Sequence, residues 1–225
     1  YDHGLGKGGN LIDFAILYKD CTVGEFLQST GHPLFFHPPT ATNKEQPQKH
    51  KESRITILKE QPLTSYSLCR YLHQRRIPLQ IAKQFCHEVA YAINERKYWA
   101  IGFKNNAGGY ELRNAFFKGS STPKDVTTFE VGAKEVSVFE GFFDFLSYKA
   151  IEQNGQLPTN NFIILNSLAF FEKARPFMEQ HAQVNLYLDR DQAGQNCTRH
   201  ALSLGAKYKD HSKLYKHFKD LNEWV

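Results

Sequence analysis

The sequence has few cysteines and no long apolar run, and these two shortages exclude several classes of protein. Four cysteines are scattered along 225 residues without a single Cys-x-x-Cys pair, so neither a zinc ribbon nor a disulfide framework is indicated. No apolar stretch approaches the roughly 20 residues that a bilayer requires, and no basic-then-apolar leader precedes the first motif. We therefore expect a soluble, cytoplasmic protein with reduced thiols and no membrane partner.

The composition is that of a globular protein with a mild excess of positive charge. Hydrophobic residues make up 41% of the chain, which is enough to bury a sizeable core in one large or two small domains. The net charge of +5 is compatible with an anionic partner such as nucleic acid. Many basic proteins bind no nucleic acid, however, so the charge alone does not identify the partner.

The first half of the chain predicts helices followed by a small antiparallel sheet. A segment rich in Pro, Thr, Asn, Gln and Lys, residues 38–53, predicts a linker because it offers almost nothing to bury. Apolar spacing predicts helices over 11–18, 23–27 and 63–75, and a further helix from Ile77 to Val89. Strands are predicted over 98–103, 109–113 and 114–117, with a hairpin turn at 105–109.

After Lys134 the pattern alternates between strand and helix. Strands are predicted over 136–139, 162–165, 185–188 and 206–209, and helices over 142–154, 168–180 and 192–204. Such alternation indicates a parallel sheet with helices on its faces, so the fold class is α/β.

Acidic residues follow two of these predicted strands. Glu140 and Asp189 stand at the carboxyl ends of strands, where ligands bind in open α/β sheets. Asp144 lies four residues after Glu140, on the same side of a helix that begins at Gly141, and Asp191 follows Asp189 by two. Clustered carboxylates repel one another unless a cation neutralises them, and hard oxygen ligands favour Mg²⁺ or Mn²⁺. The pattern predicts a metal site for phosphoryl or nucleotidyl transfer. The alternative is that these acids only cap helix N-termini, which applies most readily to Asp191.

These residues also carry a family resemblance. Glu140-Gly-Phe-Phe-Asp144, followed later by Asp189-x-Asp191 and Ala193-Gly194, resembles the TOPRIM domain of bacterial replicative primases. The resemblance implies that Glu140 serves acid/base or metal chemistry, that Asp189 and Asp191 bind magnesium, and that Asp144 supports the same site. The later Lys219-Asp220 resembles a Lys-Asp pair of that family, which makes Asp220 a further candidate ligand.

Two other segments resemble parts of the same primases. Residues 6–14 are similar to the end of the primase zinc-binding domain, but Asp2 and Leu5 occupy the places of its cysteines, so zinc is not expected. Residues 108–114 and 117–120 are similar to the basic segment of the primase core. By this likeness Arg113, Lys118 and Lys124 hold nucleotide or DNA phosphates, with Lys104 as a weaker candidate. A solvated surface charge is the alternative for each of them.

The resemblance implies a domain order. We expect a remnant of the zinc-binding module over 1–37, a linker over 38–56, a small α+β subdomain of the primase core over 57–132, and a TOPRIM domain with a parallel sheet flanked by helices over 133–225.

The function implied is that of a primase. We expect a nucleotidyltransferase that uses Mg²⁺ or Mn²⁺ and nucleoside triphosphates to make short primers on a single-stranded DNA template, serving a plasmid or mobile element together with a helicase or mobilisation protein. Two alternatives stay open: a TOPRIM nuclease that cleaves phosphodiesters with water, and an adaptor that binds nucleic acid without catalysis.

Overall fold

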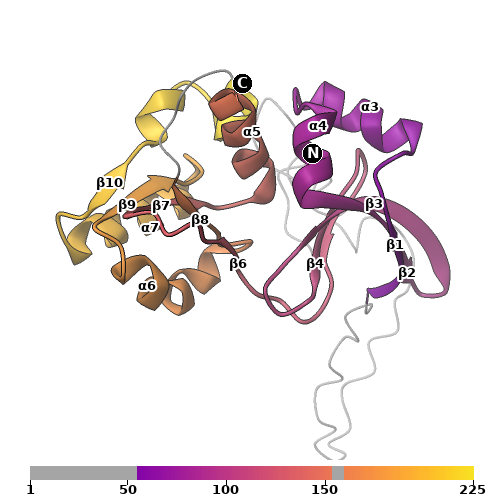
Figure 1. Cartoon of the computed structure of the whole chain (residues 1–225), viewed down its shortest axis with the longest axis horizontal. Helices are drawn as coiled ribbons and strands as arrows, with labels where there is room; N and C mark the ends of the chain where they lie inside the picture. The colour runs from indigo at the N-terminus through magenta and orange to yellow at the C-terminus, as the bar shows by residue number, and fades with distance from the viewer. Residues whose placement is uncertain (1–54, 154–159) are drawn as a thin grey trace, which may run out of the picture. The chain divides into compact units, whose positions relative to one another are not determined.

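The computed structural model of the chain describes residues 55–153 and 160–225. The predicted zinc-binding remnant and nearly all of the predicted linker lie outside the described residues. Everything described belongs to one compact unit, and its strands form two five-stranded sheets (Figure 1). None of the described helices is long and apolar enough to cross a membrane.

The first sheet is antiparallel throughout, with its strands in sequence order. Its strands are β1 (Thr56–Gln61), β2 (Cys86–Ile93), β3 (Arg96–Lys104), β4 (Tyr110–Arg113) and β5 (Lys118–Ser120). Two helices connect β1 to β2, namely α3 (Tyr66–Gln74) and α4 (Leu79–Phe85), and Figure 1 shows them together beside the sheet. Their apolar side chains pack with Ile101 and Phe103 of β3, so they cover one face of the sheet.

The helix predicted from Ile77 to Val89 is shorter than the sequence pattern indicated. Helix α4 ends at Phe85, and the chain continues directly as β2, which pairs with both β1 and β3. Val89 lies in this strand and packs into a small core on the face opposite the helices. Tertiary pairing on two sides therefore overrides the local helical pattern.

The strand predicted over 114–117 is a turn. It joins β4 to β5, and within it the backbone N–H of Asn114 donates to the carbonyl oxygen of Phe117. The sequence pattern also gave no sign of β1 or of β6 (Thr127–Phe129), two short strands that lie at sheet edges.

The second sheet has the strand order β10-β9-β7-β8-β6. Strands β7 (Glu135–Phe139), β8 (Asn161–Ile164), β9 (Gln183–Tyr187) and β10 (Tyr208–Asp210) run parallel, and β6 is antiparallel to β8 at one edge. The helical segments are α5 (Phe142–Gln153), η1 (Leu168–Phe170), α6 (Phe171–Glu179), α7 (Gln192–Leu204), η2 (Ser212–Tyr215) and α8 (Leu221–Trp224). The predicted parallel sheet flanked by helices is confirmed.

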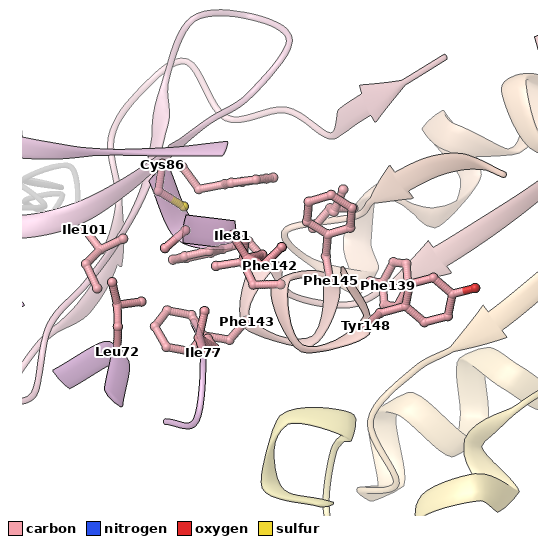
Figure 2. Close-up of a cluster of buried hydrophobic side chains, with 14 of the residues drawn as sticks. Leu72, Ile77, Ile81, Cys86, Ile101, Phe139, Phe142, Phe143, Phe145 and Tyr148 are labelled. Carbon is pink, nitrogen blue, oxygen red and sulfur yellow. The ribbon is translucent and has the colours of Figure 1, made fainter. Parts of the chain in front are cut away.

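Helix α5 joins the two sheets through a cluster of aromatic side chains. The ring of Phe142 stacks on Phe103 of β3 with centroids 5.1 Å apart, and Phe145 meets the edge of Phe85 at 4.9 Å. Figure 2 shows Phe143 beside Ile77 and Phe142 beside Ile81, two residues of the α3–α4 segment. Only Gly141 separates Glu140 from α5. The packing of α5 therefore also holds Glu140, at the end of β7, in position relative to the first sheet.

Candidate functional site

The central strands of the second sheet bring two acidic residues together. Strands β7 and β9 are parallel neighbours, with Phe139 paired to Tyr187, so their carboxyl ends lie at the same edge. Glu140 follows β7 and Asp189 follows β9. The backbone N–H of Asp189 donates to Oε2 of Glu140 at 3.4 Å, which shows how close the two strand ends are.

Three carboxylates converge at this edge. One oxygen from each of Asp144, Asp189 and Asp220 lies within 4.8 Å of the others, although the residues come from α5, from the end of β9 and from the start of α8. Asp144 is buried and accepts a hydrogen bond from the backbone N–H of Asn222 at 3.0 Å. Asp220 caps α8 by accepting from the N–H of Glu223 at 2.7 Å. We call Asp144, Asp189 and Asp220 the carboxylate cluster.

Glu140 and Asp191 lie beside this cluster. The side chain of Asp191 caps α7 by accepting from the backbone N–H of Gly194 at 3.0 Å. Its other oxygen is 3.6 Å from the ammonium of Lys219, which is also 3.9 Å from Asp189. Of the residues predicted as metal ligands, Asp189 and Asp220 are therefore in the cluster, and Glu140 and Asp191 border it.

Burial and mutual repulsion make this edge costly for negative charge. The pKa of Glu140 is raised to about 7, first by burial and then by the charge of Asp189. The pKa of Asp189 is raised to about 6 by burial and by Asp220, against the opposing effect of Lys219. The pKa of Asp144 is raised well above its usual value by burial, then by Asp220 and Asp189.

A divalent cation fits the carboxylate cluster. The donors are all carboxylate oxygens, which are hard ligands of the kind that Mg²⁺ and Mn²⁺ prefer. A bound cation would also relieve the repulsion that raises these pKa values. The donor set does not suit zinc, which favours nitrogen and sulfur ligands in tetrahedral sites.

Cationic side chains also line this pocket. The pocket has a volume of about 110 Å³, and Arg113 of β4 and Lys118 of β5 line it together with Glu140, Asp144 and Asp189. The guanidinium of Arg113 lies over the ring of Phe143, 5.4 Å from its centre. The structure thus places two of the residues predicted to bind phosphate in the same pocket as the acids.

The other two predicted cations lie outside this lining. Lys124 lies near Glu111. Burial raises the pKa of Glu111 to about 7, although the positive charges of Lys124 and Lys118 oppose this rise. The ammonium of Lys104 lies 3.9 Å from Glu60 and over the ring of Tyr110.

No sequence pattern indicated Arg75, which follows α3 and also lines the pocket. Its guanidinium lies 5.2 Å from the centre of the Phe143 ring, and its Nε donates to Oδ1 of Asn222 at 2.6 Å. The Nδ2 of Asn222 donates in return to the carbonyl oxygen of Arg75 and to Oγ of Ser147. Asn222 therefore contacts both the guanidinium of Arg75 and, through its backbone N–H, the carboxylate of Asp144. Arg75 and Asn222 are 147 residues apart, so no local sequence pattern could indicate this contact.

Asn166 is a second pocket residue that no pattern indicated. It follows β8 with a positive φ of 62°, a conformation in which asparagine is more common than most residues. Its Nδ2 donates to the carbonyl oxygen of Asp125 at 2.8 Å, which ties the strand end to the segment before β6.

Comparisons with known proteins agree with this architecture. Residues 137–225 match the model of the Toprim-like family, and residues 57–122 match that of a domain of unknown function (DUF8464). No curated protein matches the sequence.

Among solved structures, the chain is similar to the primase fragment of the bacteriophage T7 primase-helicase protein. The TM-score is 0.50 at 19% identity, and the match covers 71% of this chain and 69% of that chain. It is also similar to a chain of a complex in which bacteriophage T7 lagging-strand DNA polymerase interacts with primase domains bound to an RNA/DNA hybrid and dTTP. There the TM-score is 0.47 at 16% identity, and coverage is 73% of this chain and 97% of that chain. At this level of identity the likeness to the primase fragment shows the fold.

Proposed function

Since this chain carries a Toprim-like domain in a primase-type fold, we propose that it is a nucleotidyltransferase that makes short primers on single-stranded DNA. One observation carries the proposal: acids from the ends of β7 and β9 and from α5 and α8 meet in one pocket, and cations from the first sheet line the same pocket. Negative groups that hold a metal, facing positive groups that hold phosphates, are the two requirements of phosphoryl chemistry.

In the proposed reaction the 3′-hydroxyl oxygen of the growing primer attacks the α-phosphorus of a nucleoside triphosphate. A new P–O bond forms, the bond to the β-phosphate breaks, and pyrophosphate leaves with the electron pair. Glu140 takes the hydroxyl proton, because its carboxylate lines the same pocket directly beside the carboxylate cluster.

The residues of the chain have separate roles in this proposal. Asp144, Asp189 and Asp220 hold Mg²⁺, with Asp191 beside them. When bound, the metal would supply charge stabilisation to the phosphate oxygens. Arg113, Lys118 and Arg75 hold the phosphates of the nucleotide or template, because they are the cations of the first subdomain that line the pocket.

The proposal is tested by primer synthesis from ribonucleotides or deoxyribonucleotides on single-stranded DNA with Mg²⁺. We expect labelled short products from the wild-type protein and at least a 100-fold lower rate from Asp189→Asn, since one preorganised group of this kind contributes about 10²–10³ in rate. Glu172→Gln is the matched control. Its carboxylate is exposed on α6, where it pairs with Arg175 and His200, so its rate should equal that of the wild type.

Two further assays distinguish the alternatives. Cleavage of labelled DNA with Mn²⁺ and no nucleotides, lost in Asp189→Asn, would identify a nuclease instead. DNA binding that is insensitive to EDTA and to Asp189→Asn, without synthesis or cleavage, would identify an adaptor. Service to a plasmid or mobile element, and a helicase or mobilisation protein as partner, stay predictions from the sequence resemblance.

A further inference from the structure

Phe116 is held fully exposed at the tip of the β4–β5 turn. Its exposed fraction is 99%, although large aromatic side chains are normally buried at least in part. The turn around it is well anchored. Oδ1 of Asn114 accepts from the backbone N–H of Phe116, Nδ2 of Asn114 donates to the carbonyl oxygen of Trp99, and the ring of Phe117 stacks on Tyr91 at 5.2 Å. The backbone therefore presents Phe116 to solvent at a defined place.

Trp99 contacts this turn and lies on the same face of the first sheet as Ile101, which α3 and α4 cover, but unlike Ile101 it is exposed. In the strand register Ile101 is opposite Arg113, and Arg113 is opposite Lys118, so these residues share one face. Trp99 and Lys97 precede Ile101 by two and four residues and so lie on the same face. The indole of Trp99 is 42% exposed, and the residue opposite it on β2 is the small Ala90. Exposed aromatic residues thus occur close to the two first-sheet cations, Arg113 and Lys118, that line the pocket.

The exposed charge on this face is positive. Lys97 and Lys118 are exposed, and neither they nor Arg113 form an ion pair within the described residues. The carboxylates that β2 and β4 place on this face are turned inward. Glu88 is 4% exposed and accepts from the backbone N–H groups of Thr64 and Ser65, and Glu111 is half-buried with its pKa raised to about 7.

We propose that this aromatic-basic face, formed by Lys97, Trp99, Arg113, Phe116 and Lys118, binds single-stranded nucleic acid and leads it into the pocket. Bases stack on Phe116 and Trp99, and backbone phosphates contact the three cations. Alternation of aromatic rings with cations along one path is the arrangement that binds single strands. Because Arg113 and Lys118 also line the acidic pocket, the strand that this face holds ends at the site of chemistry.

A protein partner fits this face less well. Two separate rings flanked by cations do not make the contiguous apolar patch that forms the centre of a protein interface. Duplex DNA also fits less well, because its bases are stacked on one another and offer no free ring faces. The inference deepens the proposed function and rests on it only for the identity of the strand as template.

The test measures binding to a labelled single-stranded oligodeoxynucleotide in EDTA and without nucleotides, so that no catalysis is required. The chain has two tryptophans, Trp99 and Trp224, so Trp224→Phe leaves Trp99 as the only indole reporter. We expect saturating oligonucleotide to quench its fluorescence. Phe116→Ala should weaken binding about 5- to 150-fold, the loss that removal of one stacked base corresponds to.

Tyr66→Ala is the matched control, because Tyr66 is an aromatic residue 80% exposed at the start of α3 and is not part of this face. Its affinity should stay within twofold of the wild type. The inference is overturned if Phe116→Ala binds as tightly as the wild type, if Trp99 fluorescence does not respond, if Tyr66→Ala loses as much affinity, or if duplex DNA of equal length binds equally well.

The result is separable from the outcome for the proposed function. A protein that makes no primers but shows Trp99 quenching and the Phe116→Ala loss keeps the binding face and loses the polymerising role. A protein that makes primers while Phe116→Ala binds normally keeps the polymerising role and loses the binding face.

Discussion

At the scale of single residues, Asp144 lies in an unfavourable environment for its charge. It is buried, and its pKa is raised by burial and by the neighbouring Asp220 and Asp189. A carboxylate in such a place is retained at a cost to stability, as is common where a binding site is built into the fold. Its hydrogen bond from the backbone of Asn222 fixes its orientation, but that single bond does not offset the burial.

Asp144→Asn should stabilise the protein in the absence of divalent metal, and more so at pH 8 than at pH 5. A carboxyl whose pKa is raised in the folded state binds more protons folded than unfolded, so its contribution to stability falls as pH rises from the unfolded value near 4 through the folded value. Asparagine removes that loss and keeps an oxygen that can accept from Asn222. We expect the melting temperature at pH 8, measured by calorimetry in EDTA, to rise by at least about 2–4 °C.

The control for this substitution is Asp210→Asn, at the end of β10, where the carboxylate accepts a hydrogen bond from the backbone N–H of Ser212. It should show no gain at pH 8. Equal effects of the two substitutions, or an Asp144→Asn gain that does not depend on pH, would contradict the account given for Asp144.

At the scale of elements, the geometry of the site depends on how α7 begins. Asp191 caps the helix and Gly194 lies in its first turn, directly against the backbone of Asp189. A Cβ atom on Gly194 would lie far inside contact distance of the carbonyl oxygen of Asp189. The glycine is therefore required by close packing of helix and strand end, not by an unusual backbone angle.

Gly194→Ala should displace α7 from the end of β9. We expect a loss of roughly 1–3 kcal/mol in the free energy of unfolding, typical of an overpacked site. Urea unfolding followed by circular dichroism measures the change. Ser203→Ala, at an exposed position of the same helix, should stay within about 0.5 kcal/mol of the wild type. A Gly194→Ala protein as stable as Ser203→Ala would show that the helix can shift without cost.

At the scale of the whole molecule, the site is assembled from two sheets. The second sheet supplies the carboxylates and the first supplies Arg113 and Lys118, and the stacked aromatic rings of β3 and α5 hold the two together. This arrangement explains why neither sheet forms the pocket without the other. It also means that a ligand bridging the two sheets would stabilise the entire unit.

Mg²⁺ should raise the melting temperature of the whole protein, and this effect should be larger at pH 8 than at pH 5. At pH 5, Glu140 and Asp189 are largely protonated, because their pKa values are about 7 and about 6, and protons then compete with the metal. At a concentration of 100 times the dissociation constant, the rise at pH 8 should be roughly 5–10 °C. Thermal scans with Mg²⁺ and with EDTA measure it.

Asp189→Asn provides the comparison for this metal effect, since it removes one carboxylate charge from the cluster. Its melting temperature should respond little to Mg²⁺ at either pH. A wild-type protein whose melting temperature is the same in Mg²⁺ and EDTA at pH 8 would argue against a metal site at the carboxylate cluster.

Local sequence patterns predicted the structure correctly where the residues of one short segment determine its secondary structure. The alternation of strand and helix after Lys134 predicted the parallel sheet, and the acids behind the two strands could be placed at one edge because parallel strands end together. The same reasoning failed for residues 86–89 and 114–117, where sheet pairing and a turn replaced the local preference. The roles assigned to Glu140, Asp189 and Asp191 stay predictions until they are measured.

Fold class and the position of the acidic strand ends thus follow from hydrophobic periodicity, which each segment encodes in its own residues. Hydrophobic periodicity does not predict three other features of the molecule. These are the hydrogen bond between Arg75 and Asn222, the proximity of Asp144 to Asp220, and the shared face of Trp99 and Lys118. These contacts depend on how aromatic side chains pack one sheet against the other. Packing of that kind is a property of side chains far apart in the chain, and it exists only once the whole unit has folded.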